Sequence, residues 1–157
     1  MSRILIASGG TGGHIFPAIV FGRDRQQKGD VVSWLCGSRK LEAEIYHSSG
    51  IEPVILPLSG SPMGTRSPVK IISRIIDVFR SISRTAKYIR GFKPDEVYLF
   101  GGYISFAPLI VAKVRGIPVK GINFVTPATF TNIGNITEAV KPSASDFVNG
   151  VLALRYM

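Results

Sequence analysis

The residues with the clearest potential for chemistry form the glycine-rich run from Gly9 to His14. Four glycines fall within five positions, and glycine lets backbone N–H groups approach a ligand closely. A helix that follows the run would add aligned N–H donors and partial positive charge at its N-terminus. The pattern therefore favours a phosphate or diphosphate site, although a tight strand-to-helix turn without a ligand would use the same glycines.

Two common nucleotide-binding motifs do not fit this run. No Gly-Lys-Ser/Thr follows, as a Walker phosphate loop requires, and Ile15 stands where a dinucleotide fingerprint has its third glycine. No acidic residue stands out after the second predicted strand to bind a ribose. His14 could take a proton from a sugar hydroxyl as a general base, or it could pack or cap the helix, and spacing alone leaves both readings open.

A second glycine pair, Gly101 and Gly102, follows another apolar stretch and precedes Tyr103. Ser105 is predicted to be the N-cap of the next helix. Two such loops at neighbouring strand ends would bind two phosphates or one extended ligand. A plain glycine turn with a packed tyrosine is the alternative.

The third feature is a basic segment from Arg66 to Lys93, in which eight basic residues and one acidic residue, Asp77, carry seven of the nine net positive charges. Its basic residues recur three or four positions apart and are predicted to share one helix face, with apolar residues on another. A solvated surface and contact with an anionic membrane explain this face equally well. Nucleic acid is disfavoured because no recognition motif is present. The candidate membrane-facing residues are Arg74, Arg80, Arg84 and Lys87.

Strands and helices are predicted to alternate around these features. Short apolar runs stopped by turn residues predict strands, and longer amphipathic runs closed by glycine predict helices. Strands are predicted at 4–7, 31–35, 53–58, 97–100 and 117–122. Helices are predicted at about 17–28, 38–48, 68–90 and 105–115, the second of them capped by Ser38.

This alternation predicts an α/β fold with a Rossmann-like parallel sheet and helices on both faces. Such sheets bind ligands beyond the carboxyl ends of their strands, where both glycine loops fall. One domain is expected over residues 1–122, with a divergent tail over 123–157 that completes or flanks it.

Composition narrows the class of protein. The chain has 157 residues, of which 45% are hydrophobic, as in globular domains. Its one cysteine, Cys36, excludes an internal disulfide, and no Cys/His cluster suggests a metal site. The net charge of +9 predicts attraction to anions. With no secretory signal and no run of about 18 apolar residues, any membrane contact is expected to be peripheral.

The segment from Gly9 to Ala18 resembles the opening of the MurG family. These bacterial transferases add N-acetylglucosamine to an undecaprenyl-diphosphate-linked muramyl-pentapeptide. The segment from Phe100 to Ser105 resembles the family's second glycine loop, and segments 92–95 and 116–118 are also similar. The likeness runs from Ser2 to about Val119.

The resemblance implies the N-terminal, acceptor-side half of a GT-B glycosyltransferase. It implies that His14 is the catalytic base near the acceptor hydroxyl. Residues of the first loop are expected to contribute to the donor sugar-nucleotide site, and those of the second to bind the acceptor diphosphate. The first set is Gly10, Thr11, Gly12 and Gly13, and the second is Gly101, Gly102, Tyr103 and Ser105.

The implied reaction is inverting transfer from UDP-N-acetylglucosamine (UDP-GlcNAc), which converts lipid I to lipid II in peptidoglycan synthesis without a metal or other cofactor. The expected partners are UDP-GlcNAc, the undecaprenyl-diphosphate-linked acceptor, an anionic membrane surface and a separate chain carrying the donor domain, but no nucleic acid. The expected location is peripheral, at the cytoplasmic face of the bacterial cell membrane.

Two departures from the family pattern limit this interpretation. The family usually carries His-Glu-Gln-Asn after the Gly-Ile-Pro segment, whereas residues 122–125 retain none of the four in register. Asn123 is the candidate to replace a lost polar contact at the donor site. The family is also more than twice as long, so the chain is expected to lack the donor domain and to be inactive alone.

Three functional hypotheses follow from these patterns. The chain is half of a transferase, as a fragment, a frameshifted product or one subunit of a split enzyme. Alternatively, it is a non-catalytic module that binds polyprenyl diphosphate at the membrane. The third hypothesis is an unrelated nucleotide-binding domain.

Overall fold

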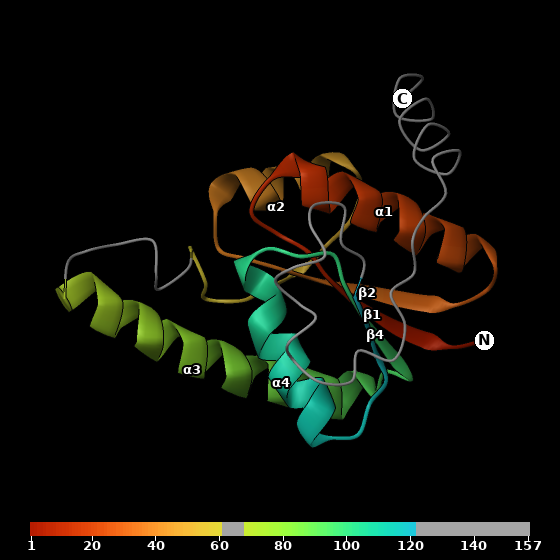
Figure 1. The fold of residues 1–157 in the computed structure, drawn as a ribbon. Helices are drawn as coiled ribbons and strands as arrows, with labels where there is room; N and C mark the ends of the chain where they lie inside the picture. The colour runs from red at the N-terminus through yellow and green to blue at the C-terminus, as the bar shows by residue number, and fades with distance from the viewer. Residues whose placement is uncertain (61–67, 122–157) are drawn as a thin grey trace.

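The computed structural model describes residues 1–60 and 68–121 of the chain, which alternate strands and helices (Figure 1). The strands are β1 (Arg3–Ala7), β2 (Val31–Cys36), β3 (Val54–Ile55), β4 (Glu96–Leu99) and β5 (Val119–Gly121). The helices are α1 (Gly12–Gln27), α2 (Lys40–Ser48), α3 (Pro68–Phe92) and α4 (Phe106–Val114), with a 3-10 turn, η2 (Tyr103–Ser105), directly before α4. The tail from residue 123, with Asn123, lies outside the described residues.

All strand pairs are parallel, and the sheet has the order β3-β2-β1-β4-β5. In the register, Ala7 at the end of β1 pairs with Leu35 of β2 on one side and Leu99 of β4 on the other. The order reverses at β1, because the chain builds outward to β3 and then returns to β4. The predicted Rossmann-like α/β fold is confirmed, and the β1/β4 boundary is the switch point at which such sheets bind ligands.

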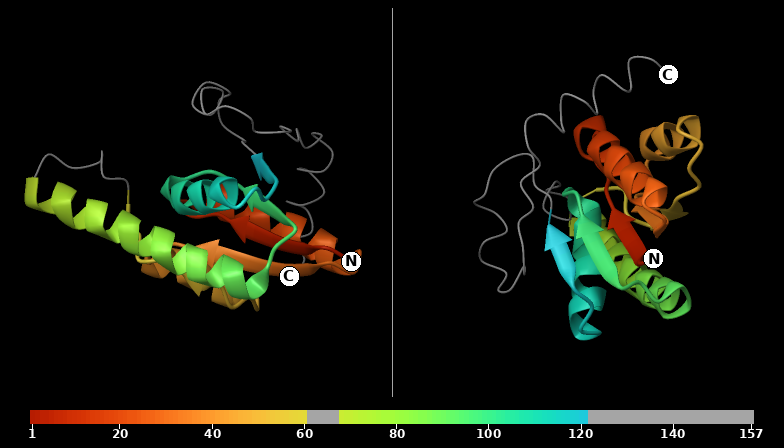
Figure 2. Two further views of the ribbon diagram at one scale, coloured as in Figure 1. Left: turned by 90° about the horizontal axis from the view of Figure 1, so that it is seen from below. Right: turned by 90° about the vertical axis from the view of Figure 1, so that its right-hand side faces the viewer.

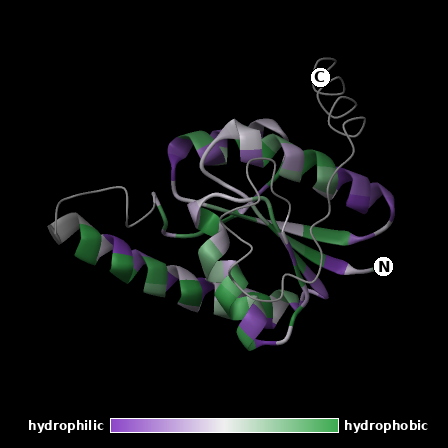
Figure 3. Cartoon of the chain, in the orientation of Figure 1, coloured by the Kyte–Doolittle hydropathy of each residue, from purple (hydrophilic) through white to green (hydrophobic). Residues whose placement is uncertain are grey.

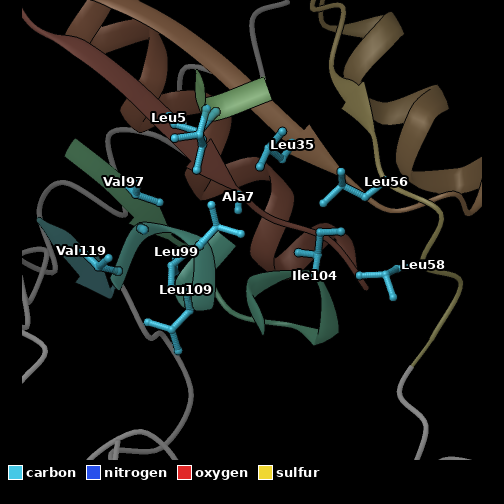
Figure 4. Close-up of a cluster of buried hydrophobic side chains, with 13 residues drawn as sticks. Leu5, Ala7, Leu35, Leu56, Leu58, Val97, Leu99, Ile104, Leu109 and Val119 are labelled. Atoms are coloured by element: carbon cyan, nitrogen blue, oxygen red, sulfur yellow. The ribbon is translucent and has the colours of Figure 1, made fainter. Parts of the chain in front are cut away.

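Helices cover both faces of the sheet, with α1 and α2 on one side and α3 and α4 on the other (Figure 2). Successive side chains of a strand point to opposite faces, so β1 contributes Ile4 and Ile6 to the core under α1 and Leu5 and Ala7 to the core over α3 and α4. Figure 4 shows the second of these cores. Full burial of such an aliphatic side chain contributes about 1.5–3 kcal/mol, so both layers stabilise the strands that carry the glycine loops.

The helix α3 is longer than the sheet it covers. Its 25 residues extend for about 37 Å, whereas the strands have six residues or fewer. Its C-terminal part packs on the core through Ile82, Ala86 and Ile89. Its N-terminal part projects past the sheet (Figure 1), and an apolar stripe is exposed there, visible as hydrophobic colour in Figure 3. The exposed apolar residues are Ile72, Ile75, Ile76 and Phe79.

The predicted elements are all present, but some boundaries were wrong. The helix α1 begins at Gly12 rather than near Pro17, so Pro17 lies inside the helix, where it leaves the Gly13 carbonyl without a helical donor. Ser38 does not cap α2, which begins at Lys40, since the Ser38 N–H donates to the Leu58 carbonyl. The strand predicted over 53–58 is shorter, at Val54–Ile55.

Candidate functional site

The two glycine loops touch each other beyond the paired ends of β1 and β4. Gly101 and Gly102 have φ values of 87° and 81°, which favour glycine. A Cβ atom on Gly102 would overlap the carbonyl oxygen of Gly9, so this glycine permits the close approach of the loops. The expectation that the loops lie at neighbouring strand ends is confirmed.

A buried carboxylate, that of Glu42 on α2, joins the two loops. Its Oε1 accepts hydrogen bonds from the Gly10 N–H at 2.9 Å and from the Tyr103 hydroxyl at 2.6 Å. Its Oε2 accepts one from the Gly37 N–H at 2.8 Å, at the end of β2. Glu42 has no exposed surface, so three segments from different strand ends converge on one internal anion.

The glycines around Glu42 leave room for this arrangement. A Cβ on Gly37 would lie 2.6 Å from Oε2 of Glu42 and would overlap the Tyr103 hydroxyl. A Cβ on Gly9 would lie 2.8 Å from the same carboxylate oxygen. These two glycines, with Gly102, are therefore explained by contacts inside the protein and do not need a ligand to account for them.

Glu42 is not among the site residues that the sequence predicted. The available signal was helical spacing, because Glu42 lies four residues before Tyr46 and these two are the buried residues of α2. Glu44, two positions away, has a side chain that is 58% exposed and pairs with Lys40. An acidic residue on the apolar face of a helix requires partners, and here the partners are the loops.

The electrostatics around Glu42 follow from its burial. Burial, together with the hydrogen bond to Glu42, raises the pKa of Tyr103, so its hydroxyl keeps its proton and donates it. The Arg39 guanidinium lies 4.9 Å from the centre of the Tyr103 ring, where it adds a cation–π contact. Burial, with a smaller contribution from the Glu42 charge, raises the pKa of Cys36 to about 12. Across residues 1–60 and 68–121, no group of three or more His, Cys, Asp or Glu side chains is placed to hold a metal ion.

The first turn of α1 presents backbone donors at the same edge of the sheet. The first N–H groups of a helix have no acceptor within the helix. Thr11 is the N-cap residue, but its side chain makes no capping hydrogen bond. The N–H groups of Gly12 and Gly13 are therefore engaged neither by the helix nor by the Thr11 side chain, as an anion site at a helix N-terminus requires.

Gly13 differs from the other glycines of the first loop. Gly10 has a φ of 98°, and a Cβ on Gly12 would lie 3.0 Å from the Phe16 ring. Gly13 has neither constraint: it is exposed, and its nearest neighbour would be the Thr11 hydroxyl at an ordinary 3.6 Å. Among the residues that the structure describes, none therefore requires glycine at this position.

His14 occupies the third position of α1, beside Gly12 and Gly13. Its backbone N–H donates to the Thr11 carbonyl at 3.0 Å. Its Nδ1 is buried and finds no hydrogen-bond partner in the part of the chain that the structure describes. A buried, unpartnered ring nitrogen is costly, and groups of this kind are common where a substrate or partner completes a site.

Two predictions for the second loop need correction. Ser105 does not cap α4 with its side chain, because its hydroxyl donates to the Gly101 carbonyl at 3.0 Å and thereby closes the loop on itself. The Tyr103 hydroxyl is committed to Glu42, so in this structure it is not a free donor for a phosphate.

The predicted membrane-facing residues do not share one environment. Arg80, Arg84 and Lys87 are exposed, and Arg80 forms a 3.5 Å ion pair with Asp77. Arg74 is half-buried, and its guanidinium lies 3.8 Å from where a Cβ on Gly60 would be. No helix within the described ranges is long and apolar enough to cross a membrane.

Residues 4–120 match the family model of the glycosyltransferase family 28 N-terminal domain. Two relatives are named UDP-N-acetylglucosamine–N-acetylmuramyl-(pentapeptide) pyrophosphoryl-undecaprenol N-acetylglucosamine transferase. The one from Glaesserella parasuis serovar 5 is 34% identical over 117 residues, covering 74% of this chain and 33% of the relative. The one from Pasteurella multocida is 35% identical over 117 residues, covering 74% and 32%. The chain thus spans about a third of the length of these relatives.

The fold has matching solved structures. The crystal structure of MurG from Acinetobacter baumannii superposes with a TM-score of 0.65 at 25% identity, over 78% of this chain and 35% of that one. A UDP-GlcNAc 2-epimerase from Neisseria meningitidis, bound to UDP-GlcNAc, gives a TM-score of 0.54 at 19% identity, over 76% and 32%. The second likeness concerns the fold alone.

Proposed function

Because the chain belongs to glycosyltransferase family 28, whose N-terminal domain it matches, we propose that it is the acceptor-side half of a transferase of N-acetylglucosamine. The donor would be UDP-GlcNAc and the acceptor an undecaprenyl-diphosphate-linked muramyl-pentapeptide, as the names of its relatives state for those proteins. The product is the disaccharide-bearing lipid of peptidoglycan synthesis.

The observation that carries this proposal is Gly13. Glycine in a helix costs roughly 1 kcal/mol relative to alanine, and nothing in residues 1–60 and 68–121 requires it at this exposed position. A diphosphate that approaches the backbone at the N-terminus of α1 does require it, because a side chain would stand between the ligand and the N–H donors.

The chemistry assigned to the site is inverting displacement. The acceptor hydroxyl loses its proton to a base as its oxygen bonds to the anomeric carbon, and the bond from that carbon to UDP breaks. We assign the base to His14, which lies one residue from Gly13. The N–H donors of the α1 N-terminus would stabilise the diphosphate charge that develops as UDP leaves, so the proposal includes no metal.

The proposal also includes peripheral attachment to a membrane through α3. The exposed stripe of Ile72, Ile75, Ile76 and Phe79 forms one face of the projecting part of this helix. Exposed basic residues follow it on the same helix, at Arg80, Arg84 and Lys87. Helices that lie on membranes typically insert apolar residues into the lipid interface. Basic residues beside them attract anionic lipid headgroups.

A binding experiment with Gly13→Ala tests the site. We expect the purified chain to bind farnesyl diphosphate or UDP-GlcNAc in calorimetry, and Gly13→Ala to weaken this at least about ten-fold while stabilising the fold by up to about 1 kcal/mol. Gly91→Ala is the matched control, since Gly91 is also an exposed helical glycine with open space around it. Unchanged affinity in Gly13→Ala, or no binding of either probe by the wild-type chain, would refute the assignment.

A transfer assay separates the catalytic half from a pure binding module. The purified chain alone is expected to transfer no N-acetylglucosamine to a lipid-linked acceptor, because it spans about a third of the length of the transferases it resembles. When a donor-domain chain restores turnover, His14→Ala should abolish most of it. Retained turnover in His14→Ala would favour the binding-only function, and turnover by the chain alone would contradict the incomplete site.

A further inference from the structure

We propose that Glu42 is a positioning residue that couples the two glycine loops, with its carboxylate acting as an internal anion that takes the place of a ligand phosphate between them. The consequence for ligand binding rests on the function proposed above. The coupling itself rests only on the hydrogen bonds of Glu42 and on the packing of the glycines around it.

The pattern of donors requires a carboxylate. Two donors, the Gly10 N–H and the Tyr103 hydroxyl, share Oε1, and the Gly37 N–H binds Oε2. An ionised carboxylate accepts hydrogen bonds on both oxygens. A glutamine amide has only one oxygen, so its NH2 group must face at least one of the three protein donors. Glutamine at position 42 therefore keeps the size of the side chain but loses at least one of the three bonds.

The carboxylate also limits where a ligand can bind. The Gly10 N–H points at Glu42 and is not part of a phosphate cradle. A phosphate placed between the loops would meet the negative charge of Glu42 in a buried setting, where like charges repel strongly. The diphosphate of the UDP donor is therefore assigned to the outer side of the first loop, at Gly12 and Gly13, while Glu42 holds the loop from the inner side.

Glu42 acts through the loops and not on a substrate. Its side chain has no exposed surface and its oxygens are engaged by protein donors. The pair Glu42–Tyr103 fixes the second loop against the first, and the overlap that any side chain on Gly102 would make with Gly9 shows how close this contact is. Loss of the carboxylate would free one loop from the other and displace the N–H donors of the first.

Nuclear magnetic resonance tests the coupling without any ligand. Removal of the Tyr103 hydroxyl in Tyr103→Phe leaves Oε1 with a single donor, so the Gly10 amide proton signal should move downfield. The same substitution in a Glu42→Gln background should move that signal less, because a neutral amide oxygen is a weaker acceptor than a carboxylate. Glu44→Gln is the control, because it makes the same charge change on the exposed side of α2. A Gly10 amide proton shift that is the same in the wild type, Tyr103→Phe and Glu42→Gln would overturn the coupling.

Calorimetry with UDP-GlcNAc, whose diphosphate is assigned to Gly12 and Gly13, tests the consequence. Glu42→Gln should weaken binding at least about ten-fold, and Glu44→Gln should not. Equal affinity in Glu42→Gln and wild type would overturn the positioning role while leaving the proposed function intact. Failure of the wild-type chain to bind would instead contradict the proposed function, and the Gly10 signal would still decide the coupling. If Glu42→Gln does not fold, Tyr103→Phe, which keeps the carboxylate, carries both measurements with a smaller expected loss of about three-fold.

Discussion

The hydroxyl of Tyr103 donates a 2.6 Å hydrogen bond to Oε1 of Glu42, which lies 61 positions earlier in the chain. The bond joins the loop after β4 to the helix after β2, across the loop after β1. The candidate site is thus organised from within, by a side chain that contributes no surface to it.

Tyr103→Phe should lower the free energy of unfolding by about 1–2 kcal/mol, because it removes a hydrogen bond to a charged acceptor. Urea denaturation measures the loss. Tyr88→Phe is the comparison, since its hydroxyl shares a 2.7 Å bond with the neutral Ser33 and should cost less. Equal losses in the two variants would show that the charge of Glu42 adds nothing to the bond.

Gly102→Ala should destabilise the fold by more than about 2 kcal/mol, because it adds a clash with the Gly9 carbonyl to the cost of a left-handed residue. Gly116→Ala isolates the second cost, since Gly116 has a φ of 67° and open space around it. It should lose only about 1 kcal/mol. The thermal midpoints of both variants check this order, and a Gly102→Ala variant as stable as Gly116→Ala would contradict the contact between the loops.

Cys36 should resist alkylation in the folded protein. Its side chain is buried, and burial raises its pKa to about 12, so only about one thiol in ten thousand is ionised at pH 8. Iodoacetamide should modify it at a rate that rises sharply across the urea unfolding transition, as mass spectrometry would detect. Fast labelling of the folded chain would contradict the packing around Cys36.

The free energy of unfolding should fall with acidity in part through Glu96. Burial alone would raise its pKa, but hydrogen bonds from Tyr98 and Lys120 outweigh burial and lower it below the ordinary 4.5. A lowered pKa stabilises the fold above pH 4.5, and that stabilisation is lost as the pH falls through the pKa of the folded state. Glu96→Gln should therefore show a shallower loss of stability between pH 5 and pH 3 than the wild type. Parallel curves would exclude this contribution.

The chain should bind vesicles that contain phosphatidylglycerol more tightly than vesicles of phosphatidylcholine. Each basic residue near an anionic surface adds about 1 kcal/mol, so replacing Arg80, Arg84 and Lys87 with glutamine should weaken binding roughly a hundred-fold. Phe79→Ser should also weaken it, because Phe79 is 66% exposed in the apolar stripe.

The control for charge replaces three basic residues outside α3, namely Lys28, Lys40 and Arg115, with glutamine. It changes the net charge equally and should retain most of the binding to vesicles. Co-sedimentation with vesicles measures the binding of all variants. Equal losses of binding in the two triple variants would show a general effect of net charge and would exclude α3 as a specific membrane-binding face.

Much of the fold was predictable because its signals are local. Short apolar runs and terminating glycines predicted the five strands and four α-helices of the described residues, but not the 3-10 turn η2. The placement of both glycine runs after strands predicted where the loops meet. Some predicted helix boundaries were wrong because other interactions outweighed the local sequence signal. Pro17 lies inside α1, at its sixth position, and does not mark the start of the helix. The Ser38 N–H donates to the Leu58 carbonyl, and α2 begins two residues later, at Lys40.

By itself, the sequence determined the α/β class and the two loops at neighbouring strand ends, because each depends on residues close together in the chain. The structure moved the start of α1 to Gly12 and so placed His14 in its first turn. The tertiary structure alone decided what each glycine is for. Gly9, Gly37 and Gly102 make room for Glu42, Tyr103 and each other's backbone, while Gly13 stays open. A pattern of glycines is the same whether a ligand or a neighbouring loop fills the space, and only the positions of residues distant in the chain distinguish the two.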